Sequence, residues 1–429
     1  MTNSTIALIS FICILIADII VVLVNSEIRI ISASTELVAA LNFISVVGLL
    51  ILGFKFRWKD KMPYSGLLVF KLFMAWSLFE FVRGVFNAHD YWDWKFLFLN
   101  YSFTILVPMA IVVGLNYETN GKTFRFILDR LFIFGFIFIP FALATNYQLY
   151  ARVVTAVSLF ILFVPYLKFR WRVLIFVVAI VSVASVVSYR SNTLRILIPM
   201  FLLLVYFSRQ LIKTKVLNIV ASVLFCLPLM FLYLGVTGQF NVFNENIFDY
   251  EVSDTATTTK NLSSDTRTFL YKEVTFSMLK RDSSFIVGEG GGAAYETDAF
   301  SNLTLNERGR YGSEVGFLNT LLYSGAVGVV LYGLMLFVPA YYAINRSSNY
   351  LCKMLGLFLA FHWVIFFFED FTRLDMNYYF IWLVIGLCLS KKFRALTDVE
   401  VKQFFNLNAK QASKNVGNYR DPRLTRRVQ

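Results

Sequence analysis

The feature of this sequence that most constrains its fold is a series of long apolar stretches. The stretch 216–236 contains no charged residue at all. A helix needs roughly 20 apolar residues to cross the hydrocarbon core of a bilayer. The sequence therefore predicts an all-α polytopic membrane protein with about twelve transmembrane helices. The predicted spans are 5–24, 35–54, 67–87, 96–115, 124–146, 148–167, 173–189, 194–208, 216–236, 314–337, 351–370 and 376–390.

Composition supports a membrane protein and argues against several other classes. Hydrophobic residues make up 58% of the 429 residues and charged residues 16%, whereas a soluble domain carries about 25% charge. The net charge is +13, but the basic residues lie between apolar segments, as topogenic charges do, so we expect no nucleic-acid partner. The four cysteines lie in or at apolar segments and the two histidines are far apart, so we expect no disulfide framework and no metal site.

The distribution of Lys and Arg between the spans predicts the topology. With the N-terminus inside, the basic short loops at 55–61, 122–125, 168–172, 209–215 and 346–353 all face the cytoplasm. Both termini are then cytoplasmic. The predicted organisation is a bundle of about nine helices over 1–236, an extracytoplasmic loop over 237–313, three more helices over 314–390 and a basic cytoplasmic tail over 391–429, which we interpret as a mobile extension.

Within the 237–313 loop, the stretch 266–281 predicts an amphipathic helix on the membrane surface or against the bundle. Leu270, Val274 and Met278 recur every four residues, and basic residues end the stretch. Arg267 lies in the first turn, where a cation opposes the helix dipole, which hints at a functional role; simple solvent exposure is the alternative. Tyr271 lies one turn later on the same face.

A glycine cluster follows at 288–292 and includes Glu289 and Gly290. Glycines permit positive φ and close backbone approach, and their N–H groups can form a nest that binds an anion. Such a cluster is weak support for a site when taken alone, because many loops are rich in glycine.

Arginines and one carboxylate surround this loop in the predicted topology. Arg308 and Arg310 precede the next span, and Glu314 lies at its start. Arg190 and Arg195 lie at the outer ends of two short spans, where snorkelling to the interface is the alternative interpretation. The planar guanidinium binds phosphate oxygens in a bidentate manner, so this set fits a diphosphate together with an acid or base.

Six ionisable residues fall within predicted spans, where charge is costly. Glu80 and Arg83 are three residues apart and share a helix face, which predicts an internal structural pair. The six are Asp18, Lys71, Glu80, Arg83, Asp129 and Arg130.

Three stretches together resemble one known superfamily. Ser188-Tyr-Arg190-Ser resembles an S-R-[GS] helix start at the outer surface. Arg267-Thr-Phe-Leu-Tyr271, about twenty residues before the glycine cluster, resembles R-x-x-x-W…G-x-G-x-G. The stretch 314–328 resembles the helix H-N-x-Y-L-x-x-L-x-E-x-G-x-x-G. Their order and side of the membrane resemble the O-antigen polymerase and O-antigen ligase superfamily (Wzy- and WaaL-type proteins). Glu314 stands where that family has histidine, and the missing histidine favours a polymerase. Tyr271 stands where the family has tryptophan.

The resemblance implies a GT-C-like, metal-independent glycosyltransferase without cofactors in a bacterial cytoplasmic (inner) membrane. Its substrates would be undecaprenyl-diphosphate-linked oligosaccharides, joined into O-antigen of lipopolysaccharide, capsule or exopolysaccharide. Membrane lipid, a chain-length regulator and a flippase are the further expected partners. Two alternatives remain open: a ligase that transfers the glycan to lipid A core or another acceptor, and a transporter or flippase of the lipid-linked unit.

The resemblance also implies roles for the residues above. Glu314 and Arg267 are the expected catalytic residues, with Glu314 as the general base and Glu289 as the next candidate. The expected residues for binding diphosphate or glycan are Arg190, Arg195, Arg308, Arg310, Tyr271, Glu289 and Gly290.

Overall fold

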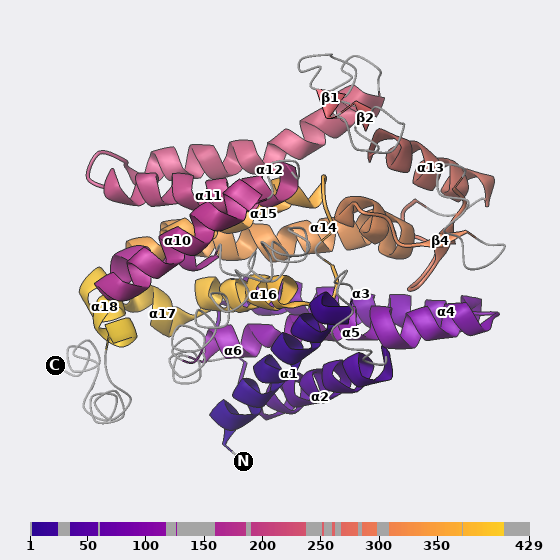
Figure 1. The fold of residues 1–429 in the computed structure, drawn as a ribbon, viewed down its shortest axis with the longest axis horizontal. Coiled ribbons are helices and arrows are strands. Elements are labelled where there is room, and N and C mark those ends of the chain that lie inside the picture. The colour runs from indigo at the N-terminus through magenta and orange to yellow at the C-terminus, as the bar shows by residue number, and fades with distance from the viewer. Residues whose placement is uncertain are drawn as a thin grey trace.

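The computed structural model gives a mainly helical protein (Figure 1). It describes residues 2–24, 35–58, 61–116, 126, 159–185, 190–236, 251–252, 260–261, 267–281, 285–297, 309–370 and 372–406. At a few of these positions, among them Arg190 and Arg267, only the backbone is described.

Five helical segments in these ranges are long and apolar enough to cross a membrane, so the chain is a multi-pass membrane protein. Three are single helices early in the chain, α1 (Asn3–Val24), α2 (Thr35–Lys55) and α3 (Tyr64–Asn87). The fifth is α14 (Gly316–Asn345). The fourth, Tyr91–Leu115, is built from α4 (Tyr91–Phe96), a π-helical turn Leu97–Tyr101, α5 (Ser102–Leu106), a 3₁₀ turn Val107–Ala110 and α6 (Ile111–Leu115).

The described residues do not show all of the twelve spans predicted from the sequence. The predicted spans 124–146 and 148–167 lie mostly outside the described residues. Several other apolar helices are short, and the 14 residues of α16 cover only about 21 Å at 1.5 Å per residue. Polar residues limit this helix, since Asp375 caps its first turn and Ser390 follows its last. The short helices are α10 (Phe169–Ser185), α15 (Tyr350–Phe366) and α16 (Met376–Leu389), whereas α11 (Arg190–Phe207) and α12 (Thr214–Val236) have 18 and 23 residues.

Helix α16 lies at the centre of the bundle (Figure 1) and packs against α6, α14 and α15. All of its residues except Asn377 are buried. The backbones of α16 and α6 approach closely, because a Cβ atom at Gly386 would lie 2.3 Å from the Ile111 carbonyl oxygen. Small residues permit such contacts between membrane helices. The bundle interior is therefore filled by apolar side chains around α16.

Helix α14 is interrupted at Gly325, where φ is +63° and ψ is −168°. The residues 285–292, which we call the glycine loop, pair with the backbone on both sides of this break. Non-helical backbone at membrane depth needs hydrogen-bond partners from within the protein. The loop provides them, since its carbonyl oxygens accept two hydrogen bonds from α14 and its N–H groups donate two. The four bonds are Ala326 N to Phe285 O (2.8 Å), Val327 N to Ile286 O (3.2 Å), Glu289 N to Leu322 O (2.7 Å) and Gly290 N to Tyr323 O (3.0 Å).

The helix predicted from 266–281 is confirmed as α13 (Arg267–Lys280), which lies beside the start of α14 (Figure 1), but its apolar residues are not confined to one face, as an amphipathic helix requires. Leu270, Val274 and Met278 are each at most 1% exposed, as their spacing predicts. The opposite face is not purely polar, because Phe276 and Leu279 are exposed. Exposed apolar side chains on a helix at the end of the bundle favour contact with the membrane surface.

The 237–313 segment also contains two small antiparallel sheets that the sequence did not indicate. Strand β1 (Glu251–Val252) pairs with β2 (Lys260–Asn261). Strand β3 (Ala294–Tyr295) pairs with β4 (Arg310–Tyr311), with Tyr295 opposite Arg310. The second sheet connects the glycine loop to the residues that lead into α14.

The predicted loops at 168–172, 209–215 and 346–353 and the described residues of 55–61 meet at one end of the bundle (Figure 1), which we call the inner end, whereas 122–125 lies outside the described residues; α3 ends and α14 begins at the opposite end, which we call the outer end. Lys391 N donates to Lys61 O (3.1 Å), and Ser348 N donates to Arg394 O (2.8 Å). The start of the tail is not a mobile extension. It forms α17 (Lys391–Ala395) and α18 (Asp398–Asn406), because Phe393 and Val401 supply a buried apolar face. Residues 407–429 lie outside the described residues.

We predict that Gly325→Ala lowers the stability of the protein by about 1–3 kcal/mol, the usual cost of a strained backbone. A Cβ atom there would lie 2.3 Å from the Ile286 carbonyl oxygen, at a φ that L side chains rarely adopt. Thermal unfolding in detergent measures the effect. Gly333→Ala, in the helical part of α14, is the control and should shift stability by less than about 1 kcal/mol. Equal shifts for the two variants would contradict the role of the break.

Candidate functional site

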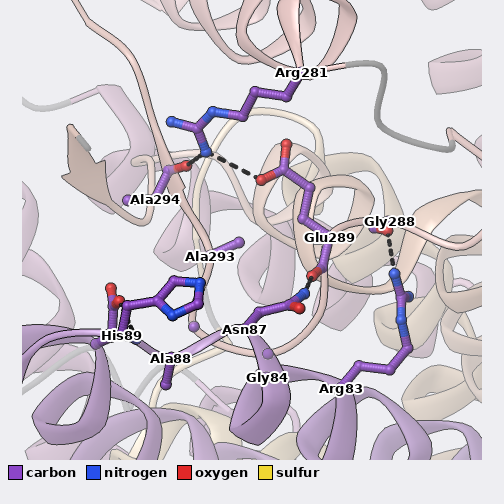
Figure 2. A pocket seen from close by; sticks show the side chains of 13 residues that line it. Arg83, Gly84, Asn87, Ala88, His89, Arg281, Gly288, Glu289, Ala293 and Ala294 are labelled. Carbon is purple, nitrogen blue, oxygen red and sulfur yellow. Dashed lines mark hydrogen bonds and ion pairs between the residues drawn. The ribbon is translucent and has the colours of Figure 1, made fainter.

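A pocket of about 450 Å³ opens at the outer end of the bundle (Figure 2). It is enclosed by the end of α3, the start of α4, the glycine loop and the residue after α13. The lining residues are Arg83, Gly84, Asn87, Ala88, His89, Asp93, Arg281, Gly288, Glu289, Gly291, Gly292, Ala293 and Ala294.

Arg83 lines this pocket and forms the predicted pair with Glu80. Arg83 Nη1 lies 3.4 Å from Glu80 Oε2, and the Glu80 side chain is 0% exposed. The same guanidinium donates to the carbonyl oxygens of Val287 (3.0 Å) and Gly288 (2.8 Å). Gly291 N donates to the Glu80 carbonyl oxygen at 2.9 Å. The ion pair is therefore structural, as predicted, and it also holds the glycine loop against α3.

Two positions in the loop require glycine. Gly290 has a φ of +101°, and a Cβ atom there would lie 3.1 Å from Gly84 N. At Gly291 a Cβ atom would lie 2.2 Å from the Tyr101 ring. The loop thus follows the surface of α3 and the helix after it more closely than any side chain permits.

The prediction that this glycine cluster forms an anion nest is wrong for its central N–H groups. Those of Glu289, Gly290 and Gly291 donate to the carbonyl oxygens of Leu322, Tyr323 and Glu80. These bonds hold the loop in the break of α14 and on α3, so the three donors do not face a ligand. The close backbone approach expected of the glycines is present.

Polar side chains of both signs line the mouth of the pocket. Arg281 Nη1 lies 3.1 Å from Glu289 Oε2 and donates to the Ala294 carbonyl oxygen at 2.6 Å (Figure 2). Asn87 donates to the Glu289 carbonyl oxygen at 2.7 Å. The ring of His89 points into the space between these groups (Figure 2). Because the charges largely balance, the pocket is suited to a ligand rich in hydroxyl groups.

The opposite wall of the pocket is fixed by Asp93. Its Oδ1 accepts a hydrogen bond of 2.7 Å from Tyr311 of β4, and it forms a capping box with Asp90 at the start of α4. The Tyr311 ring stacks on Phe96 with centroids 5.1 Å apart. Strand β4 is thereby attached to α4.

A second polar cluster surrounds the start of α14. Arg310 Nη2 lies 3.5 Å from Glu314 Oε1, and the Glu314 side chain is 51% exposed. Arg195 of α11 lies 2.5 Å from Glu369 Oε1, after the end of α15. The next residue, Asp370, donates its N–H to the Glu314 carbonyl oxygen at 2.7 Å. Arg310 therefore lies beside Glu314, and the Asp370 backbone bond links Glu314 to the segment that carries Glu369, the acidic partner of Arg195.

Tyr295 connects this cluster to the pocket. Its hydroxyl lies 3.5 Å from Arg310 Nη1, and the residue pairs with Arg310 between β3 and β4. Burial raises the pKa of Tyr295, an effect that the nearby Arg310 opposes. The neighbouring Glu296 accepts a 2.6 Å hydrogen bond from Lys280, which lowers the pKa of that carboxyl group.

The other predicted site residues whose side chains are described lie outside the cluster at the start of α14. Tyr271 donates to the Phe367 carbonyl oxygen (2.7 Å) and stacks on Phe317, so it attaches α13 to α14 and α15. Glu289 lines the pocket, and Gly290 lies in its loop. Arg190 and Arg267 begin α11 and α13, but their side chains, and all of Arg308, lie outside the described residues.

The sequence reasoning missed several pocket residues. Asn87, His89 and Arg281 were not singled out, and Arg83 was interpreted only as a partner of Glu80. One signal was present, because Arg83 and Asn87 are four residues apart and so share a face of α3. Within the described part of the chain, no group of three or more His, Cys, Asp or Glu residues is placed to hold a metal ion.

Comparisons of the chain with protein-family models, with curated proteins and with solved structures gave no match.

We predict that Arg83→Met destabilises the protein by about 3–5 kcal/mol, the cost of leaving a buried charge without its partner. In a Glu80→Gln background the same change should cost clearly less, because only the bonds to the loop are lost. A double-mutant cycle on thermal unfolding separates the two contributions. Lys280→Met is the control, since the side chains of Lys280 and its partner Glu296 are 71% and 43% exposed and their ion pair should contribute about 0–1 kcal/mol. Additive effects of Arg83→Met and Glu80→Gln would contradict coupling within the pair.

Proposed function

We propose that this protein is a membrane glycosyltransferase that polymerises lipid-diphosphate-linked oligosaccharide repeat units at the outer end of its helix bundle. One observation carries the proposal. The glycine loop lies in the break of α14 and places a hydroxyl-binding pocket next to a cluster of arginines and a carboxylate. Strands β3 and β4 join the two features directly. A sugar site beside a diphosphate site is what transfer from a lipid carrier requires.

The proposed reaction joins two lipid-linked glycans. A hydroxyl oxygen of the acceptor attacks the anomeric carbon of the donor's reducing-end sugar and forms the new glycosidic bond. The bond from that carbon to the diphosphate oxygen breaks, and undecaprenyl diphosphate leaves with the electron pair. Glu314 accepts the hydroxyl proton as general base. Its side chain is half exposed, so a substrate hydroxyl can reach it.

The arginines stabilise the charge that develops on the departing diphosphate. Arg310 is the best placed of the described residues, because it lies next to Glu314 and is bound to it only loosely, at 3.5 Å. Arg195 is 10% exposed and pairs closely with Glu369, so it contacts a diphosphate only after that carboxylate moves. Arg190, Arg267 and Arg308 complete the proposed set on the strength of the sequence resemblance.

The pocket binds the glycan in this proposal. Asn87, His89 and Arg281 supply donors, and Glu289 and Asp93 supply acceptors, around a space large enough for about one sugar ring or two. Glu289 remains the second candidate for the general base.

The transporter alternative rests on charges within the spans, namely Lys71, Glu80 and Asp129, and the described ones give it less support. Lys71 lines a cleft to which α16 contributes no residue. Glu80 and Arg83 are used to hold the glycine loop. Asp18 accepts a 2.9 Å hydrogen bond from Met376 N at the start of α16. A transporter needs charge along a central cavity, whereas here apolar side chains fill the space around α16. Asp129 lies outside the described residues.

We predict that Glu314→Gln lowers polymer synthesis by about 10²–10⁴-fold, the usual contribution of general base catalysis. Glu289→Gln should act mainly by weakening acceptor binding and so raise KM. Both effects are measured with purified protein in liposomes that is supplied with a lipid-diphosphate-linked repeat unit at several concentrations. The glycan ladder on a gel gives the rate of polymer synthesis. Lys280→Gln removes an exposed charge outside the site and is the control. The reverse pattern would make Glu289 the base.

We also predict that Arg267→Ala abolishes the ladder while protein levels stay normal. Arg267→Lys should restore little activity, because an ammonium group cannot bind two phosphate oxygens in the planar geometry of a guanidinium. Transfer only to an added lipid A core acceptor would identify a ligase. Movement of the lipid across the vesicle membrane without any covalent product would identify a transporter and exclude the enzyme.

A further inference from the structure

A second cavity lies at the other end of the bundle, far along α3 from the pocket described above. It is a cleft of about 250 Å³ between α2, the start of α3 and the 3₁₀ turn Val107–Ala110. Its walls are apolar and include Leu50, Leu67 and Phe70, while Lys71 supplies the single charged side chain among the lining residues.

Lys71 is the unusual feature of this cleft. It lies seven residues into α3, which is about 10 Å along the helix axis from its start, within a segment apolar enough to span a membrane. The side chain is exposed on the protein surface, and its ammonium has no acidic partner within the described ranges. An ammonium at this depth is costly unless an anion or water accompanies it.

The walls of the cleft are held open by specific contacts. The Trp58 indole stacks on Phe70 with ring centroids 5.0 Å apart, and its Nε1 donates to the Gly53 carbonyl oxygen at 3.2 Å. Gly53 lies against Met109, whose sulfur would be 2.9 Å from a Cβ atom at that position. Phe54 is 87% exposed at the edge of the cleft. The cleft is thus a defined shape that opens toward the surrounding lipid.

Basic residues, which we call the basic rim, are neighbours in the chain of the lining residues Phe54 and Trp58 at the inner end. Lys55 and Arg57 are exposed on the segment that leaves α2. Lys61 donates its N–H to the Trp58 carbonyl oxygen, and its own carbonyl oxygen accepts from the N–H of Lys391. Basic pockets between transmembrane helices on the cytoplasmic side bind anionic lipid headgroups. This rim lies at the end that the Lys/Arg pattern predicts to be cytoplasmic.

We propose that this cleft is a binding site for one anionic phospholipid, with an acyl chain against Leu50, Leu67 and Phe70 and the phosphate on Lys71. The apolar walls and the opening toward lipid select a ligand that comes from the bilayer. The ammonium, which has no acidic partner among the described residues, and the basic rim select a negative headgroup. The site is independent of the glycosyltransferase proposal, because it shares no lining residue with the outer pocket.

Native mass spectrometry of the delipidated full-length protein tests the site. The protein is titrated with phosphatidylglycerol or with phosphatidylcholine of the same acyl chains. The first phosphatidylglycerol should bind at least about fivefold more tightly than phosphatidylcholine, the factor that corresponds to ~1 kcal/mol per lysine near an anionic surface. Lys71→Met should remove this preference, and Lys71→Arg should keep it.

Two further variants make the result specific. Lys215→Met removes an exposed charge at the same end of the bundle, on α12, and should leave binding unchanged. Leu50→Trp fills the cleft but keeps Lys71, and it should weaken phosphatidylglycerol binding. Thermal unfolding without added lipid confirms that each variant is folded. An unchanged preference in Lys71→Met, an equal loss in Lys215→Met, or no effect of Leu50→Trp would each overturn the proposal.

Discussion

The outer end of this protein depends on one set of backbone hydrogen bonds, those between the glycine loop and the break in α14. Gly325 interrupts the helix, and the loop from 285 to 292 satisfies the N–H and carbonyl groups around the interruption. Within a membrane such groups are costly when they lack partners. The break and the loop therefore stabilise each other. Arg83 then fixes the loop to α3 with two bonds to its carbonyl oxygens, so that two stretches far apart in the sequence, 83–93 and 281–294, enclose one pocket.

The parts of the structure that follow local patterns could be predicted from the sequence. The apolar stretches predicted the long helices, and the four-residue spacing of Leu270, Val274 and Met278 predicted α13 and its buried face. The docking of the glycine loop could not be predicted, because its partners lie more than thirty residues away and only the fold brings them together. The same docking explains why the expected anion nest is wrong: its N–H groups are used within the protein. The folded start of the tail was missed because α17 and α18 are short and have few buried residues.

The outer end combines two electrostatic environments, which the sheet of β3 and β4 connects. The pocket pairs Arg281 with Glu289 and is close to neutral, as a ligand with many hydroxyl groups requires. The cluster at the start of α14 contains Arg195 and Arg310, each paired with a carboxylate, which the proposed diphosphate would have to replace. The inner end has a different character, with a single ammonium in an apolar cleft and a basic rim. Each end thus presents the chemistry that suits its proposed ligand: a lipid-linked glycan at one end and an anionic phospholipid at the other.

Cysteine cross-linking between positions 285 and 326 tests the central structural claim most directly. The chain's four native cysteines are first replaced, and Phe285→Cys and Ala326→Cys are then introduced together. The backbone bond of 2.8 Å between these residues predicts rapid disulfide formation on mild oxidation in native membranes. A control pair that combines Phe285→Cys with Val330→Cys, one turn further along α14 and exposed, should not cross-link. Cross-linking of the control pair alone, or of neither pair in folded protein, would contradict the docking of the loop in the break of α14.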